Sequence, residues 1–229
     1  LSGNDFNATT KLVNGNYSKR YGAPFAILDS VYRGQQKLLA AQSDLTFVPL
    51  EIAWSENNKP TTGPVDLTTG DIGTSFFDVE NQKLYILGAE NSDTDEYDAH
   101  VVMHEWGHYI EDQYSRSDSF GGPHGDEDIL DPTVAFSEGF ANAWAAMMLD
   151  DALYIDTSGT AQAEAGLSIN LESDAVSDTL FSDLDDSYLL DGFYSENSIA
   201  EVLYDLADAK NDDNVQIDLK DLWSVLTGH

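Results

Sequence analysis

The five residues His104, Glu105, Trp106, Gly107 and His108 have the types and the spacing of a zinc-binding helix. On an α-helix, residues four apart project from one face, about one turn from each other. His104 and His108 can therefore both direct an imidazole nitrogen at one metal ion, at roughly 2.0–2.1 Å. Glu105 lies beside that face, where its carboxylate can accept a proton from a water on the metal. The pattern H-E-x-x-H thus predicts a zinc site in which Glu105 is the catalytic base.

The residues around this motif predict the helix that must carry it. The segment from Asp95 to Ser115 reads as one helix, because its apolar residues recur at helical spacing. Acidic residues at its start suit the positive end of the helix dipole. On the same helix, His100 is expected at the surface and Glu111 is expected to be solvated. Gly107 leaves a bare patch on the helix surface, on which we expect another element to pack closely.

A catalytic zinc ion takes three protein ligands and keeps one position open for water. Glu111 and Tyr114 stand where a metzincin has Gly and His, and this excludes that class. The strongest remaining donor is Glu138, thirty residues after His108 on a second predicted helix. The competing donors lie in the loop between the two helices: His124, Asp126, Asp128 and Asp131.

The run HEWGH followed by SEGFANAW resembles the gluzincin metallopeptidases, the thermolysin-like and aminopeptidase-like class, over roughly residues 83–150. In that class the third zinc ligand is a Glu on a downstream helix. The resemblance implies that His104, His108 and Glu138 bind zinc and that Glu105 is the general base. The spacing of thirty residues is longer than in thermolysin-like enzymes, so no subfamily is assigned. Asn142, one turn after Glu138, could hold the second nitrogen of His108.

A peptidase of this kind also needs a donor for the oxyanion of the tetrahedral intermediate, which in gluzincins is a downstream Tyr or His. Tyr194 is the preferred candidate, because it precedes a predicted helix with Ser195 as its N-cap. Tyr204 and His124 are the alternatives. Tyr154 is set aside because it would close the helix of Glu138, about 24 Å along the axis from that residue. Tyr188 is set aside because its acidic segment would not hold a donor still.

The expected fold is α+β and zincin-like, with a small mixed sheet packed on the HExxH helix and a mostly helical C-terminal lobe. One catalytic domain covers residues 1–229, with possible sub-lobes at 1–118 and 119–229. The expected helices and strands follow in chain order: a helix over 23–42, strands Leu45–Trp54, Ser75–Val79 and Lys83–Ala89, the helix Asp95–Ser115, and helices Thr133–Tyr154, 195–209 and Leu219–Leu226. Weak strand signals occur near Leu167–Leu171. The Lys83–Ala89 strand is expected to border the cleft and to pair with an extended peptide.

The composition limits the partners. The 229 residues include 42 acidic and 10 basic residues, for a net charge of −32, which argues against nucleic acid and anionic membranes. We expect a monomer that acts on a peptide or protein, secreted or at the cell surface, bacterial, and trimmed from a longer precursor. No cysteine is present, so thiolate metal sites are excluded. A structural calcium ion is the minority interpretation of two acidic runs, Asp183, Asp185 and Asp186, and Asp208, Asp212, Asp213, Asn214 and Asp218.

The sequence therefore predicts zinc-dependent hydrolysis of peptide bonds, with an endopeptidase favoured over an exopeptidase. Two alternatives stay open. One is a binding or scaffold protein with a structural zinc site, whose fourth position another protein ligand would close. The other is a zinc hydrolase that acts on a non-peptide amide.

Overall fold

The computed structural model describes residues 11–13, 16–18, 20–125, 128–172, 175–177, 192–208 and 215–228. In the N-terminal half the elements are β1 (Lys11–Val13), β2 (Asn16–Ser18), α1 (Ala23–Ala41), β3 (Glu51–Trp54), β4 (Lys59–Pro60), β5 (Asp71–Gly73), β6 (Phe76–Asp78), β7 (Lys83–Ile86), the 3-10 helix η1 (Asp95–Tyr97) and α2 (Ala99–Tyr114). They are followed by α3 (Pro132–Leu149), β8 (Leu153–Ser158), η2 (Thr160–Gln162), β9 (Ala165–Asn170), β10 (Ala175–Ser177), α4 (Glu196–Asp205) and α5 (Leu219–Thr227).

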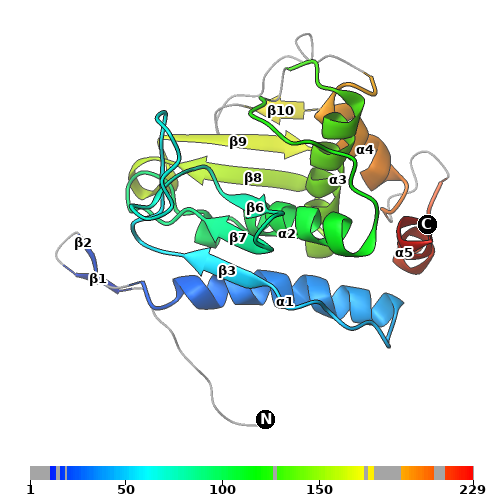
Figure 1. The fold of residues 1–229 in the computed structure, drawn as a ribbon, viewed down its shortest axis with the longest axis horizontal. Coiled ribbons are helices and arrows are strands. Elements are labelled where there is room, and N and C mark those ends of the chain that lie inside the picture. The colour runs from blue at the N-terminus through cyan, green and yellow to red at the C-terminus, as the bar shows by residue number, and fades with distance from the viewer. Residues whose placement is uncertain are drawn as a thin grey trace.

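A small mixed sheet of order β3-β7-β6 lies beside α2, with α1 along the other side of β3 (Figure 1). The predicted strands Ser75–Val79 and Lys83–Ala89 form a hairpin, since β6 pairs antiparallel with β7 and Phe77 lies opposite Leu84. The predicted strand Leu45–Trp54 is paired only from Glu51, where β3 joins β7 in parallel register. The prediction that the Lys83–Ala89 strand pairs with a peptide is wrong, because β7 is hydrogen-bonded on both of its edges.

The helix α2 runs through the centre of the molecule and buries nearly its whole circumference. Trp106 and Tyr109 pack on the side of α1 and the first sheet, and both are at most 1% exposed. On the opposite side, a methyl group on Gly107 would lie 3.2 Å from Cα of Ala141 in α3. The expected close packing at Gly107 is thus confirmed, and it brings the two helices of the HEWGH and SEGFANAW runs together.

The C-terminal part is less helical than the sequence predicted. The predicted helix Thr133–Tyr154 ends at Leu149, because Asp150 adopts the left-handed conformation with φ 56°. Leu153 then begins β8, which forms an antiparallel sheet of order β10-β9-β8. These strands account for the weak signals near Leu167–Leu171 and bring the chain back past α2.

The helices α3 and α4 stand next to each other at one end of this second sheet (Figure 1). Their close packing depends on Gly139, where an added methyl group would lie 2.5 Å from the carbonyl oxygen of Glu196. One apolar cluster extends from Ile27 in α1 to Trp223 in α5, so residues of both predicted sub-lobes contribute to the same core.

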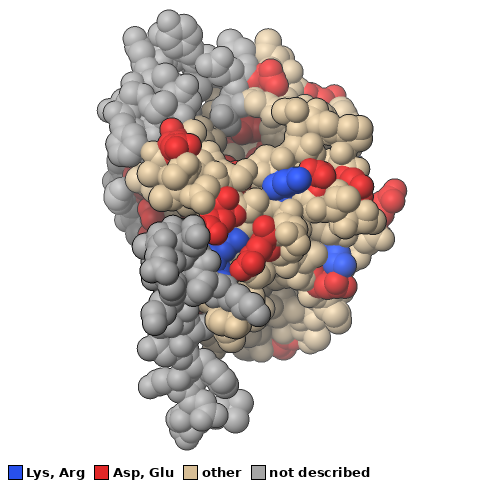
Figure 2. Space-filling model, turned by 90° about the vertical axis from the view of Figure 1, so that its left-hand side faces the viewer, with Lys and Arg blue, Asp and Glu red and all other residues tan. Residues whose placement is uncertain are grey.

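The surface reflects the acidic composition. On the face in Figure 2, the Lys and Arg side chains lie beside Asp and Glu side chains. The ion pairs of the described residues include the surface pair of Lys59 with Asp71, at 3.2 Å, and the buried pair of Arg20 with Glu96. Among the described residues, no helix has both the length and the apolar character that crossing a membrane requires.

Candidate metal centre

His104 and His108 of α2 and Glu138 of α3 meet in one cluster. The two Nε2 atoms of the histidines lie 3.1 Å apart. Oε2 of Glu138 lies 3.3 Å from Nε2 of His104 and 3.2 Å from Nε2 of His108. Ligands arranged as a tetrahedron at about 2.0–2.1 Å from a zinc ion lie about 3.3 Å from one another. The three donor atoms therefore have the separations that one zinc ion requires.

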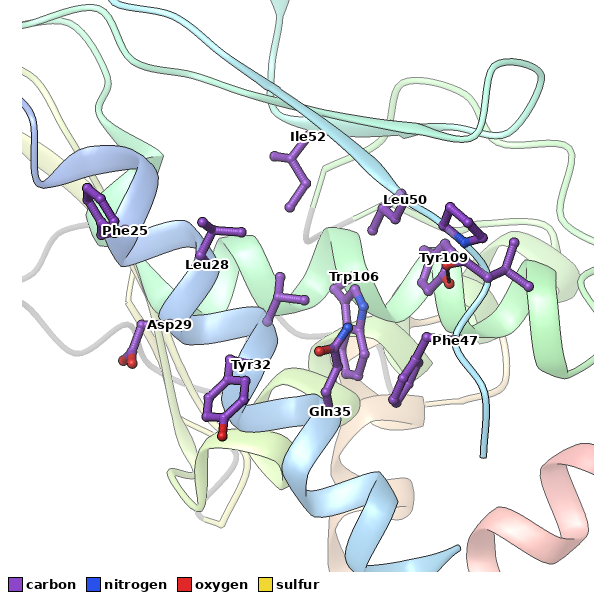
Figure 3. Close-up of a pocket in the computed structure, with 13 residues that line it drawn as sticks. Phe25, Leu28, Asp29, Tyr32, Gln35, Phe47, Leu50, Ile52, Trp106 and Tyr109 are labelled. Atoms are coloured by element: carbon purple, nitrogen blue, oxygen red, sulfur yellow. Dashed lines mark hydrogen bonds between the residues drawn. The ribbon is translucent and has the colours of Figure 1, made fainter. Parts of the chain in front are cut away.

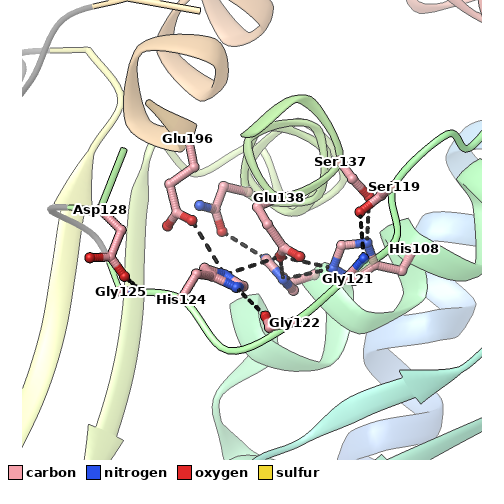
Figure 4. A network of polar contacts seen from close by, with 12 residues as sticks. His108, Ser119, Gly121, Gly122, His124, Gly125, Asp128, Ser137, Glu138 and Glu196 are labelled. Carbon is pink, nitrogen blue, oxygen red and sulfur yellow. Dashed lines mark hydrogen bonds and ion pairs between the residues drawn. The ribbon is translucent and has the colours of Figure 1, made fainter. Parts of the chain in front are cut away.

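The second nitrogen of each histidine is held by a hydrogen bond (Figure 4). Nδ1 of His104 donates to Oδ1 of Asn142 at 2.7 Å. Nδ1 of His108 lies 3.3 Å from Oγ of Ser137, whose hydroxyl in turn donates to Glu111 at 2.5 Å. With a proton on both Nδ1 atoms, the lone pairs of both Nε2 atoms point into the cluster. Three electron-pair donors thus converge on one point, an arrangement that a cation stabilises.

These contacts correct three expectations from the sequence. Asn142 binds His104, not His108, because it lies one turn beyond Glu138 and so beside the earlier histidine. Glu111 was expected to be solvated but is only 3% exposed and supports His108 through Ser137. His100 was expected at the surface but is 7% exposed, with Nε2 3.2 Å from the carbonyl oxygen of Asp151.

The electrostatics of the cluster follow from burial and from the mutual contacts of its members. Burial opposes ionisation of Glu138, but the hydrogen bonds of His104 and His108 outweigh it and hold the pKa of Glu138 well below its usual range. Burial also lowers the pKa of His108, but contacts with Glu111 and Glu138 raise it to about 10. Without a metal ion, a proton that His108 shares with Glu138 therefore offsets part of the negative charge at the point where the three donors meet.

Glu105 lies beside the cluster but is not one of its three donors. Its side chain is 7% exposed, and it accepts a hydrogen bond from the backbone N–H of Phe77 in β6. Burial raises the pKa of Glu105, against the opposing effect of the nearby histidines. A carboxylate whose pKa lies above its ordinary value is better suited to accept and return a proton.

The loop between α2 and α3 brings His124 to the edge of the cluster (Figure 4). Nε2 of His124 lies 3.5 Å from Oε2 of Glu138 and 3.4 Å from Oε2 of Glu196. His124 does not belong to the group of donors that lie within 4.8 Å of one another. Its side chain is 25% exposed and can turn toward a molecule bound at the cluster.

Two of the other competing donors, Asp128 and Asp131, are not part of the cluster. Asp131 caps α3 by accepting a hydrogen bond from the backbone N–H of Thr133. Asp128 accepts a hydrogen bond from the backbone N–H of Gly125. Asp126 lies outside the described residues.

The tyrosines are placed differently from the sequence-based ranking. The ring of Tyr194 folds back over Gly192 and contacts Phe193, with 5.4 Å between ring centroids. Tyr204 is 9% exposed in the core, and Tyr188 lies outside the described residues. Tyr154, set aside because of its distance, packs against His104 with 6.1 Å between ring centroids. The distance on which Tyr154 was set aside was wrong, because α3 ends at Leu149 and β8 reverses the chain direction directly after it.

A separate apolar groove lies between α1 and β3 (Figure 3), and none of His104, His108 and Glu138 lines it. Trp106 and Tyr109 form its floor, and Phe25, Leu28 and Tyr32 line one wall. Asp29 is the only charged residue of its lining. This groove therefore lacks the donors that metal-dependent chemistry requires.

Comparison with known proteins identifies one family. The sequence model of the Mycolysin C-terminal domain matches residues 46–223, which includes both helices of the cluster. Neither the curated proteins nor the solved structures contain a match to this chain.

Proposed function

The chain belongs to the Mycolysin C-terminal domain family, and from this premise and the cluster geometry we propose that it is a zinc-dependent peptidase of the zincin type. The convergence of His104 Nε2, His108 Nε2 and Glu138 Oε2 within 3.1–3.3 Å of one another is the observation that carries the proposal. These residues would hold the ion. When bound, zinc supplies Lewis acidity toward the scissile carbonyl and the attacking water.

Glu105 is the general base of the proposed reaction. Its carboxylate accepts the proton of the attacking water and then transfers it to the leaving amine. Asn142 and the pair Ser137–Glu111 keep both Nδ1 atoms protonated, and this keeps both Nε2 atoms available as ligands. The raised pKa of Glu105 supports this role, since it moves the carboxyl group toward the pH at which proton transfer is most effective.

His124 is a better placed oxyanion donor than Tyr194. Its Nε2 lies at the open edge of the cluster, and Glu196, which is 5% exposed, stabilises its protonated form. A protonated imidazole can donate to the developing negative charge. Tyr194 instead contacts Gly192 and Phe193 in its own segment. His124 and Tyr194 are therefore tested in the same assay.

The substrate proposed for this site is an extended peptide. In the sheet order β3-β7-β6, β6 has no neighbouring strand among the described residues on the side away from β7. The backbone N–H of Phe77 in β6 donates a hydrogen bond to the carboxylate of Glu105. A peptide that extends the sheet at β6 would place its backbone beside the general base. As expected from the sequence, a secreted or cell-surface location suits such an enzyme.

The proposal is tested with Glu105→Gln, Glu138→Ala and His124→Ala, measured for zinc content and for cleavage of an unfolded protein. Glu105→Gln should retain zinc and lose about two or more orders of magnitude in rate. Glu138→Ala should lose zinc, and the control Asp128→Ala should retain it. His124→Ala should retain zinc and lose about 10²–10³ in kcat, with Tyr194→Phe near the parent rate. Full zinc binding without cleavage by the parent would instead identify a non-catalytic zinc protein.

A further inference from the structure

A second group of potential metal ligands lies at the start of α2. Asp93, Asp95 and Asp156 each offer a carboxylate oxygen, and these atoms all lie within 4.8 Å of one another. Asp93 and Asp95 belong to the segment that leads through η1 into α2, whereas Asp156 lies on β8. The two segments are also joined by backbone, since Asp93 forms a bridge with Ser158.

Two oxygens of this acidic group are buried without a hydrogen bond. Asp95 is 3% exposed, and its Oδ2 accepts a hydrogen bond from the hydroxyl of Ser75. Oδ1 of Asp95 has no hydrogen-bond partner among the described residues, and the same is true of Oδ1 of Asp93. Burial of an unpaired carboxylate oxygen is costly, because water no longer solvates its charge. Two such atoms in one cluster therefore indicate a missing partner.

The missing partner must be positive. Burial, a side-chain hydrogen bond with Asp93 and the charges of Asp93 and Asp156 raise the pKa of Asp95 well above its ordinary value. Among the described residues, no lysine or arginine forms an ion pair with Asp93 or Asp95; the nearby Arg20 pairs with Glu96 instead. Either a proton or a cation must neutralise this group, and only a cation would also link the two segments.

We propose that Asp93, Asp95 and Asp156 bind a calcium ion. Calcium takes six to eight oxygen ligands at about 2.3–2.6 Å, and aspartate carboxylates are among its usual donors. Two oxygens on opposite sides of such an ion lie about 4.8 Å apart, so the separations in this group permit one shared ion. The donors are all oxygen, which favours calcium or magnesium over zinc. This site differs from the two acidic runs that the sequence singled out.

The ion would fix the segment before α2 to β8. Asp98, directly before α2, already accepts hydrogen bonds from the backbone N–H and the hydroxyl of Thr157. The same strand carries Tyr154, which packs on His104. Calcium at Asp93, Asp95 and Asp156 would thus brace the start of the helix that holds both histidines. It adds stability to the folded state and takes no part in the reaction.

The test is thermal unfolding of the full chain, loaded with zinc and carrying Glu105→Gln so that self-cleavage cannot alter the result. Calcium at roughly 100-fold above its Kd should raise the Tm by about 5–10 °C. Asp95→Asn should abolish this rise, and so should Asp156→Asn, which changes a less buried residue. The matched controls are the exposed residues Asp44 and Asp218, the latter from a predicted acidic run. Asp44→Asn and Asp218→Asn should respond to calcium like the parent.

Calorimetric titration of the same protein with calcium alone gives the stoichiometry, which we expect to be one ion per chain. An unchanged Tm and no bound calcium would overturn the proposal. The carboxylates would then be neutralised by a shared proton and not by a cation. A calcium response that persists in both Asp95→Asn and Asp156→Asn would overturn it as well, and would place the ion elsewhere. Magnesium added in place of calcium should give a clearly smaller rise, because it demands octahedral geometry at shorter distances.

Discussion

Replacement of Asn142 tests how much a residue that holds a proposed ligand, without being a ligand itself, contributes to zinc affinity. Oδ1 of Asn142 accepts the Nδ1–H of His104 at 2.7 Å, and Asn142 is 4% exposed, so no water can readily take its place. In Asn142→Ala the ring of His104 loses the bond that fixes its tautomer and orientation. Loss of such a support typically reduces metal affinity 10–100-fold, or about 1.4–2.8 kcal/mol. Asn142→Asp keeps the acceptor and adds charge, so its zinc affinity should equal or exceed that of the parent.

The assay is competition for zinc against a chromophoric chelator, followed by the cleavage rate of the fully loaded protein. Ser137→Ala is the matched variant for His108, and it should show a smaller loss, because its contact with Nδ1 is longer at 3.3 Å. Alanine is favourable in a helix interior, so Asn142→Ala should fold. Parent-like zinc affinity in Asn142→Ala would refute the reasoning, as would a loss in Asn142→Asp as large as that in Asn142→Ala.

Three further predictions concern protons, packing and charge. Zinc binding at pH 8 should release about one proton, because contacts with carboxylates outweigh burial and raise the pKa of His108 to about 10; titration calorimetry in buffers of different ionisation enthalpy measures it. Gly139→Ala should lose about 2 kcal/mol in urea unfolding, since its methyl group would meet backbone at 2.5 Å, whereas Gly63→Ala should change little. Arg20→Met should cost about 3–5 kcal/mol at pH 8, because it leaves the buried Glu96 unpaired. That loss should shrink as the pH falls from 8 toward 6, since burial, against the effect of Arg20, raises the pKa of Glu96 to about 6 in the parent, and without Arg20 this pKa lies higher still, so Glu96 of the variant becomes protonated first and needs no counter-charge.

The members of the candidate metal cluster were predictable because their chemistry is encoded locally. The i, i+4 spacing of His104 and His108 determines a shared helix face, and Glu138 stands out between Phe136 and Phe140 in the next helix. The hydrogen bonds around them were harder to predict. Which ring Asn142 supports depends on how far α3 is shifted along α2, and the close contact at Gly107 determines that shift.

Burial of polar residues in α2 could not be predicted from periodicity alone. A pattern of apolar residues assigns one face to the core, but α2 is covered on nearly all sides, so that His100 and Glu111 are buried too. The end of α3 was misplaced because its stop signal is a conformation and not a typical residue type. Asp150 ends the helix in the left-handed conformation, a position that Gly or Asn usually takes. The group of Asp95 and Asp156 depends on the reversal that follows, and their separation in sequence gives no local signal.

The three donors of the cluster come from two helices, so the two helices must pack together before all three donors can bind one ion. Neither α2 nor α3 contains all three donors, and the segment 115–131 must close into a loop before His108 and Glu138 can meet. At the proposed zinc site, binding to all three donors would therefore stabilise the chain only after the α2–α3 hairpin has formed, and it would slow unfolding rather than speed folding. Zinc uptake during refolding should consequently lag behind helix formation, so the ion reports the moment at which the hairpin closes.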